Sequence, residues 1–454
     1  MDRIRSLMAR PAAYEPINEF ADDTDGTTRA QRRDESQFSR LEYGIFFLLG
    51  ISMLWAWNMF LAATPYFYTR FQSDDWTRLH YQPSILSVST VTNLGIAYIL
   101  AKLQKNASYP WRITLSLLIN CAVFAVLAFS AIVFNDVSAR AYFGFLMVMV
   151  FGASLATGIN QNGVFAYVSG FGRDEYTQAI MSGQGVAGVL PCIIQIFSVL
   201  AVPSDEDSVD RDPGQVQDPS MPQTTSSRSA FVYFITSTGI SVIALLAFLY
   251  LLRNQPQSRQ KVAGADDESI ADEHEHSRTV SLWTLFTKLR FLAFAVFMCF
   301  LVSMVFPVYT AEIQSVNDPA SSRIYDPSVF VPLAFLLWNL GDLVGRMGVA
   351  IPGVSLGKYP QVAAIVAIAR VMFIPIYQLC NINGKGAVVK SDIFYLAVQF
   401  LFGATNGYLG TSCMMGASHW VVADERPAAG GFMSMVLVGG LAAGSILSFS
   451  VAST

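Results

Sequence analysis

Residues 329–351 read VFVPLAFLLWNLGDLVGRMGVAI, an apolar run long enough to cross a lipid bilayer as one helix. Asp342 and Arg346 interrupt this run four residues apart, so they share one face of that helix. A charged side chain at the bilayer centre costs at least about 2.5 kcal/mol, and such residues therefore face the protein interior or a watery cavity. This face is the first candidate for a polar pathway through a membrane.

The composition of the whole chain supports a membrane location. Hydrophobic residues make up 53% of the 454 residues and charged residues 14%, whereas soluble proteins carry about 25% charged residues. About eleven segments offer the roughly 20 mostly apolar residues that a spanning helix needs. Their approximate spans are 41–66, 83–104, 112–134, 141–169, 177–201, 230–252, 290–312, 328–350, 359–380, 392–419 and 429–452. We therefore predict an all-α polytopic membrane protein.

Two polar loops interrupt these helices and indicate two halves. The predicted parts are a disordered cytosolic N-terminus at 1–40, helices one to five at 41–201, a non-cytosolic polar loop at 202–229, helix six at 230–252, a disordered cytosolic loop at 253–289, and helices seven to eleven at 290–454. The second loop leaves six helices before it and five after it. Such a division is typical of transporters that are built from two repeats.

The distribution of positive charge predicts the orientation of the helices. If the N-terminus is cytosolic, about 20 of the 29 Lys and Arg residues fall on the cytosolic side and about 8 on the other, which agrees with the positive-inside rule. The first forty residues are polar and show no secretory signal, so we expect the first helix to direct its own insertion.

Several patterns that would indicate other kinds of protein are weak. The five cysteines have no metal-like spacing and are expected to be packed thiols, and His274-Glu275-His276 lacks a third fixed ligand. Residues 183–188 match the dinucleotide-binding pattern, but in an apolar helix small residues instead let neighbouring helices approach closely. No intramembrane cluster of acid, base or metal-binding groups is visible. We predict no enzyme activity, no metal, no cofactor and no nucleic-acid partner.

A few polar residues at membrane depth are candidates for contact with a solute. Trp57 lies too deep for an interfacial aromatic belt, and it either stacks on a ligand or fills a helix crossing. Gln161 either bonds a ligand or joins two helices. Asp342 and Arg346 form either a purely structural salt bridge or part of a solute-binding site, and Asn339 adds an amide to the same face. Together these groups suit a hydroxylated, uncharged solute.

Three further polar residues have structural interpretations. Arg370 either pairs with a carboxylate that the sequence does not identify or extends to the membrane surface. Asn406 is interpreted as a packing contact between helices. His419 is interpreted as a satisfied polar residue at the membrane interface rather than as a proton sensor.

Seven segments occur in the order that is typical of one known family. They read LLGISMLWAWNMFLAATPYF (48–67), AIMSGQGVAGVLP (179–191), FPVYTAEI (306–313), WNLGDLVGR (338–346), ARVMFIPIYQLCN (369–381), FGATNGYLGTSCM (402–414) and AGGFMSMVLVGGLAAG (429–444). In these segments the chain resembles the equilibrative nucleoside transporter family, in particular its fungal-type members. The segments extend from the first expected helix to the eleventh, so the resemblance covers essentially the whole membrane part.

This resemblance implies eleven helices in a major-facilitator-like 6+5 arrangement, with a central substrate cavity and alternating access for nucleosides and, in some members, nucleobases. It places around the substrate Leu54, Trp57, Leu94, Gln161, Phe335, Asn339, Asp342, Arg346 and Leu441. Gln161 would engage the base, and Asp342 and Arg346 the ribose hydroxyls. Two departures bear on substrate range: Ala56 stands where family members often carry proline, and Leu343 where they carry a large ring.

We predict a facilitative nucleoside uniporter whose partners are the lipid bilayer and nucleosides such as adenosine and uridine. Two alternatives stay open. One is proton-coupled nucleoside transport with Asp342 or Glu312 as the proton carrier, and the other is a sugar or drug carrier of the major-facilitator type. The sequence does not decide between the plasma membrane and a vacuolar or other internal membrane. It also does not decide between purine and pyrimidine nucleosides.

Overall fold

The computed structural model describes residues 38–104, 107–134, 136–201, 220–254, 280–304, 306–318 and 321–452. Residues Arg40–Thr454 belong to one structural unit, and its described part is almost entirely helical. The predicted disordered segments 1–40 and 253–289 fall largely outside the described residues, and the His274-Glu275-His276 motif falls wholly outside them. Residues 282–289 are described and helical, so the prediction of a disordered loop up to residue 289 was wrong for that part.

The described helices fall into the two expected groups. The first half contains α3 (Arg40–Ala62), α4 (Thr64–Arg70), α5 (Asp75–Lys102), α6 (Tyr109–Val133), α7 (Ala139–Gly170), α8 (Asp174–Ala201) and α9 (Ser220–Asn254). The second half contains α11 (Leu282–Ser303), α12 (Phe306–Glu312), α13 (Pro327–Gly348), α14 (Pro360–Ala369), α15 (Phe373–Tyr377), α16 (Asp392–Gly416) and α17 (Arg426–Ala452). Short 3-10 helices include η5 (Arg370–Met372) and η6 (Ala417–Trp420).

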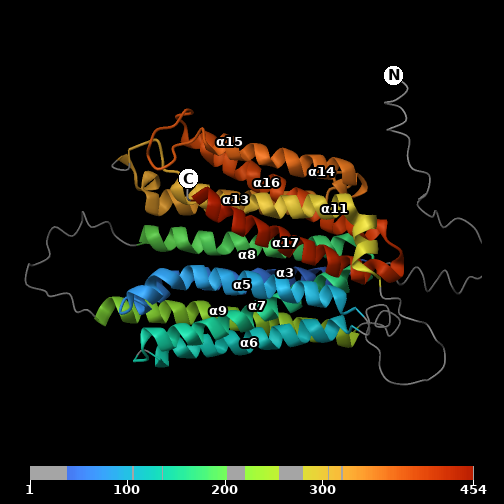
Figure 1. The fold of residues 1–454 in the computed structure, drawn as a ribbon, viewed down its shortest axis with the longest axis horizontal. Helices are drawn as coiled ribbons and strands as arrows, with labels where there is room; N and C mark the ends of the chain where they lie inside the picture. The colour runs from blue at the N-terminus through green and yellow to red at the C-terminus, as the bar shows by residue number, and fades with distance from the viewer. Residues whose placement is uncertain are drawn as a thin grey trace, which may run out of the picture. The chain divides into compact units, whose positions relative to one another are not determined.

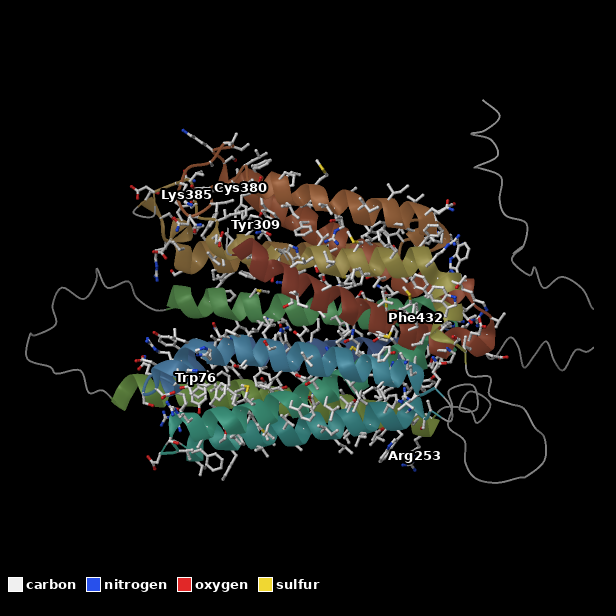
Figure 2. The ribbon with its side chains drawn as sticks, viewed as in Figure 1. Trp76, Arg253, Tyr309, Cys380, Lys385 and Phe432 are labelled. Carbon is white, nitrogen blue, oxygen red and sulfur yellow. The ribbon has the colours of Figure 1, made fainter. Side chains whose placement is uncertain are left out.

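The long helices run alongside one another, and their connections alternate between two ends of the bundle (Figure 1). We call the end at which α3 begins the near end and the opposite one the far end. Arg253, at the end of α9, lies at the near end, whereas Trp76, at the start of α5, and Lys385 lie at the far end (Figure 2). Side chains fill the spaces between neighbouring ribbons (Figure 2).

Ten described segments are long and apolar enough to cross a membrane. This confirms the prediction of an all-α polytopic membrane protein. The predicted tenth span, α16, is 25 residues long but is not among the ten. Gln399 and Asn406 lie inside it together with several glycines, and these residues lower its hydropathy. The total of eleven spans therefore stays a prediction.

Several helices differ from the predicted bounds. The first predicted span is divided into α3 and α4, and α5 and α11 each begin eight residues earlier than predicted, at Asp75 and Leu282. Because Pro222 falls in the first turn, where its missing N–H costs little, α9 extends back to Ser220, into the segment predicted as a loop to residue 229. The predicted seventh span is divided into α11 and α12 just before Pro307. The predicted ninth span is divided at η5, which places Arg370 at a break between two helical pieces.

Short polar side chains fix the starts of several helices. A side-chain oxygen just before the helix accepts a hydrogen bond from a backbone N–H of the first turn, which otherwise lacks a partner. These residues are Ser108 before α6, Ser138 before α7, Ser281 before α11, Asp326 before α13 and Ser391 before α16. The start of α13, and with it the register of Asp342 and Arg346, is thus set locally.

Glycines bring α13 and α16 into backbone contact. Gly341 and Gly345 on α13 face Gly403 and Gly407 on α16, and each pair has the four-residue spacing that favours close helix packing. A methyl carbon added at Gly407 would lie 1.9 Å from the carbonyl oxygen of Asp342. The two helices therefore approach without intervening side chains, and polar groups beside the glycines come within bonding distance.

Residues 183–188 pack helices together, as the sequence predicted. A methyl carbon at Gly183 would lie 2.0 Å from the carbonyl oxygen of Phe47 on α3. One at Gly188 would lie 2.4 Å from Oδ1 of Asn339 on α13. This segment of α8 thus contacts a helix of its own half and a helix of the other half.

The loops at the near end also join the two halves. Nε2 of His419 in η6 lies 3.0 Å from Oδ2 of Asp174, the first residue of α8. Ser418 donates a hydrogen bond of 3.5 Å to the other oxygen of Asp174. Gly172, which has a φ of 63°, turns the chain just before α8, where a methyl group would meet the Arg426 guanidinium. His419 therefore has a polar partner at the start of α8.

Candidate functional site

An ion pair on α13 is the centre of the candidate site. Nε of Arg346 donates a hydrogen bond of 2.6 Å to Oδ2 of Asp342, and the side chains are 6% and 5% exposed. The helix begins at the Asp326 cap, where hydrogen bonds from the hydroxyl and the backbone N–H of Ser328 lower the pKa of the Asp326 carboxyl. The pair thus lies one helical turn apart on a buried face of a helix with a fixed start.

The second oxygen of Asp342 is bound by α16. Nδ2 of Asn406 donates a hydrogen bond of 2.8 Å to Oδ1 of Asp342. Asn406 is 2% exposed and lies next to Gly407, whose missing side chain allows this approach. Both carboxylate oxygens of Asp342 therefore accept a hydrogen bond from the protein.

The guanidinium of Arg346 reaches across to the first half. Nη1 of Arg346 donates hydrogen bonds to the carbonyl oxygen of Met181, at 2.8 Å, and to Oε1 of Gln184, at 3.1 Å, both on α8. Gln184 in turn donates to the sulfur of Met53 on α3, at 3.2 Å. The ion pair on α13 thus connects α16 of its own half with α8 of the other half.

Asn339 lies one turn before Asp342 at the same contact with α8. Its Nδ2 donates hydrogen bonds to the carbonyl oxygen of Phe335, at 2.9 Å, and to the sulfur of Cys192 on α8, at 3.5 Å. The structure therefore brings together three of the predicted residues, Asn339, Asp342 and Arg346, along the α8–α13 contact.

The predicted polar residues of the first half are not joined to this group by hydrogen bonds. Gln161 on α7 is 8% exposed, and Trp57 on α3 is partly buried. Within the described ranges, no hydrogen bond links either side chain to α13. Asn58, the neighbour of Trp57, instead donates to the carbonyl oxygen of Ala187 on α8, at 2.6 Å.

The four predicted apolar residues lie in different surroundings. Leu54 packs against the first-half core around Phe60, Leu441 packs against the core around Met433, and Phe335 packs edge-on against Phe306 at 5.1 Å between ring centroids. Leu94 on α5 is 36% exposed. No contact gathers these four side chains into one group among the residues that the structure describes.

Arg370 is the second deeply buried cation. It is 2% exposed, and its Nη1 donates to the carbonyl oxygen of Cys299, at 2.8 Å, and to its sulfur, at 2.9 Å. Its Nε donates to Thr405, at 3.4 Å, and its guanidinium carbon lies 4.9 Å from the ring centre of Phe402. No carboxylate of a described residue lies within ion-pair distance of Arg370, and the guanidinium remains inside the bundle. Neither expectation for this residue was therefore right.

Two amides of this site were missed in the sequence. Gln184 falls between Gly183 and Gly185, in a segment that was interpreted only as packing, and Asn406 was also interpreted as packing. A signal for Asn406 was available, because the glycine pairs at 341/345 and 403/407 have the spacing that favours close helix packing, although the pair at 440/444 shares it. An amide inside a glycine pair would then face the opposing helix.

The group combines acceptors, donors and one opposed pair of charges, but no metal-binding cluster. No set of three or more His, Cys, Asp or Glu side chains suited to a metal occurs in the described part of the chain. The arrangement is chemically suited to hydrogen bonding with a polar solute at the junction of the two halves.

Comparisons with known proteins give the family. The chain matches the family described as "Nucleoside transporter" over residues 146–256 and 250–453. It is 30% identical to the nucleoside transporter FUN26 of Saccharomyces cerevisiae, over 91% of this chain and 84% of that protein. It is 27% identical to equilibrative nucleoside transporter 1 of Rattus norvegicus, over 89% of this chain and 95% of that protein.

The fold is shared with more distant transporters. The crystal structure of the E. coli fucose:proton symporter FucP superposes with a TM-score of 0.54 at 13% identity, over 91% of this chain and 96% of that one. This similarity concerns the fold alone, and it confirms the predicted major-facilitator-like architecture. Together with the sequence matches, it shows that this chain is a polytopic membrane transporter rather than an enzyme, and that it belongs to the nucleoside transporter family.

Proposed function

We propose that this chain carries nucleosides across a membrane as a facilitative uniporter that works by alternating access. Family membership supports nucleosides as the substrate class, and the major-facilitator-like fold supports the mechanism. The observation that carries the proposal is the buried Asp342–Arg346 pair on α13, at the contact between the halves.

The unused hydrogen-bonding capacity of this pair fits a ribose. A carboxylate has about four acceptor directions, of which Asn406 and Arg346 take two at Asp342. A guanidinium has five N–H donors, and the two on Nη2 of Arg346 meet no acceptor among the described residues. The two neighbouring hydroxyls of a ribose offer two donors and several acceptors. They therefore complement the pair without bringing a charge of their own.

The remaining predicted residues complete the proposed binding site. We assign base recognition to Gln161, whose amide bonds to no described residue, and stacking to Trp57. Asn339 adds a polar contact beside the ribose. Leu54, Leu94, Phe335 and Leu441 are assigned to the apolar wall.

Alternating access requires that contacts between the halves break in turn. At the near end these contacts include Arg346 with α8 and His419 with Asp174. We assign the near end to the cytosol, because it carries Arg112, Arg253 and Lys288, as the positive-inside rule expects. Opening toward the cytosol then separates α8 from α13.

Uptake into liposomes that contain the purified protein tests the substrate and the coupling. We expect uridine and adenosine to equilibrate across the membrane at the same rate with and without a pH gradient, and labelled adenosine uptake to be reduced by uridine but not by glucose. Accumulation driven by a proton gradient would show proton coupling. Competition by glucose would point to a sugar carrier, and uptake of uracil would extend the range to nucleobases.

Variants of the ion pair test the site. Asp342→Ala and Arg346→Ala are each expected to lower uridine uptake roughly 100-fold or more, because each leaves a buried charge without its partner. The matched control is the pair Asp75 and Arg78, whose charged groups lie 2.9 Å apart in the first turn of α5, at the far end of the bundle. Alanine substitutions there should leave uptake unchanged. Uptake close to the wild-type rate by both α13 variants would contradict the site assignment.

A further inference from the structure

A chain of buried polar groups continues from Asp342 away from α8, into the second half. Asn406 donates to Asp342 at 2.8 Å. The sulfur of Cys299 on α11 lies 3.3 Å from Oδ1 of Asn406, and Nη1 of Arg370 donates to that sulfur at 2.9 Å. Four groups from η5, α11, α16 and α13 thus form one continuous series of hydrogen bonds.

The chemistry of the two ends favours one direction for the bonds in this series. The carboxylate of Asp342 only accepts, so the amide of Asn406 must turn its NH₂ toward it. The amide oxygen then faces Cys299, whose S–H donates to it at 3.3 Å and has the backbone carbonyl oxygen of Asn406 as a second, longer acceptor at 3.6 Å. The guanidinium of Arg370 only donates, so it can bind the sulfur lone pair but cannot reverse the series.

The surroundings hold these groups in place. Cys299 is fully buried, Asn406 is 2% exposed, and the glycine contact of α13 with α16 leaves no side chain between Asn406 and Asp342. Arg370 is further fixed by the carbonyl oxygen of Cys299 and by the Phe402 ring. A closely packed interior transmits small displacements of one group to the next.

We propose that Arg370, Cys299 and Asn406 form a one-directional hydrogen-bond relay that positions the Asp342 carboxylate for the ribose hydroxyls of a nucleoside. The proposal rests on the proposed function, because it assigns Asp342 to the ribose. None of the three residues has to touch the substrate, so they are positioning residues. Selectivity for an intact ribose then depends on a thiol and a guanidinium located behind the binding site.

The test measures the initial uptake of uridine and of 2′,3′-dideoxyuridine in liposomes. Cys299→Val has a similar volume but neither donates nor accepts, so it should lower uridine uptake roughly tenfold and leave dideoxyuridine uptake nearly unchanged. Cys299→Ser keeps both functions in its hydroxyl and should restore the ratio of the two rates toward the wild-type value. Cys299→Ala, which cannot clash with its neighbours, serves if the valine variant does not fold.

The matched control is Cys380→Val, because Cys380 is also buried in the second half, at 4% exposure, and has no bond to any group of the relay. Its uptake ratio should equal that of the wild type. The relay is refuted if Cys299→Val and Cys299→Ala change uptake of both substrates by the same factor, or if the serine variant behaves like valine. The proposed function itself fails in a different way, if the wild type shows no saturable uridine uptake or if Asp342→Asn leaves the ratio unchanged.

Discussion

The two buried arginines of the second half lie in contrasting regions. Arg346 bonds a carboxylate on its own helix and two acceptors on α8 of the other half. Arg370 bonds only groups of its own half, namely Cys299 on α11 and Thr405 on α16, and no described carboxylate pairs with it. The first charge is compensated and lies where the halves meet. The second is enclosed in one half, with no described carboxylate within ion-pair distance.

The difference indicates two uses for a charge at membrane depth. A compensated pair at the contact of two halves can exchange its partners when the halves move, and it can receive a polar solute. A cation inside one half keeps the same neighbours throughout, so it can only hold geometry. Variants that remove one arginine at a time should separate these two uses.

The largest effect on stability is expected for Arg346→Met. It leaves the Asp342 carboxylate buried without its partner, which costs about 3–5 kcal/mol of the free energy of unfolding. Adding Asp342→Asn removes the unpaired charge and should recover part of that loss. Thermal unfolding of the purified variants in detergent measures both values. Equal midpoints for the single and the double variant would contradict a paired charge at this position.

A smaller effect is expected for Arg370→Met. No carboxylate loses its partner, so the cost is that of unpaired polar groups around Cys299, about 1–3 kcal/mol. Asp342→Asn should not rescue this variant, since the two side chains share no direct bond. The comparison fails if Arg370→Met is as destabilising as Arg346→Met in the same thermal assay.

The smallest effect on stability is expected for removal of the helix cap before α13, the helix that carries Arg346. Asp326 caps α13, whereas η5, which carries Arg370, has no side-chain cap. Asp326→Ala should cost about 1 kcal/mol at pH 7. Because hydrogen bonds from Ser328 lower the pKa of Asp326, the contribution of the cap is full above the ordinary carboxyl range and disappears as the pH falls through the lowered value. Unfolding midpoints at pH 7 and at low pH check this, and a difference independent of pH would contradict it.

The sequence predicted the parts of this molecule that depend on local pattern. Apolar segments of spanning length gave the helices, and the spacing of Asp342 and Arg346 gave their shared face. The small residues at 183–188 correctly predicted close helix contacts. The family resemblance predicted the major-facilitator-like arrangement. The periodicity of apolar residues predicts helices but not how they are arranged.

The parts that were missed depend on contacts between distant segments. Which helix lies opposite Asp342 is a tertiary property, so the bond from Asn406 was not visible in either segment alone. The same holds for Arg370, whose neighbours come from α11 and α16. The length of α9 was underestimated because Pro222, which was expected to lie in a loop, is tolerated in the first turn of a helix. The roles of Gln161, Trp57 and the apolar candidates stay predictions.

The central claim is that the Asp342–Arg346 pair binds the ribose of a nucleoside. Equilibrium binding of labelled uridine to the purified protein tests it without requiring transport. The account predicts saturable binding by the wild type and binding weaker by roughly tenfold or more for Asp342→Asn, because a hydroxyl then loses a charged acceptor. Uridine binding of equal strength by the wild type and Asp342→Asn would contradict it.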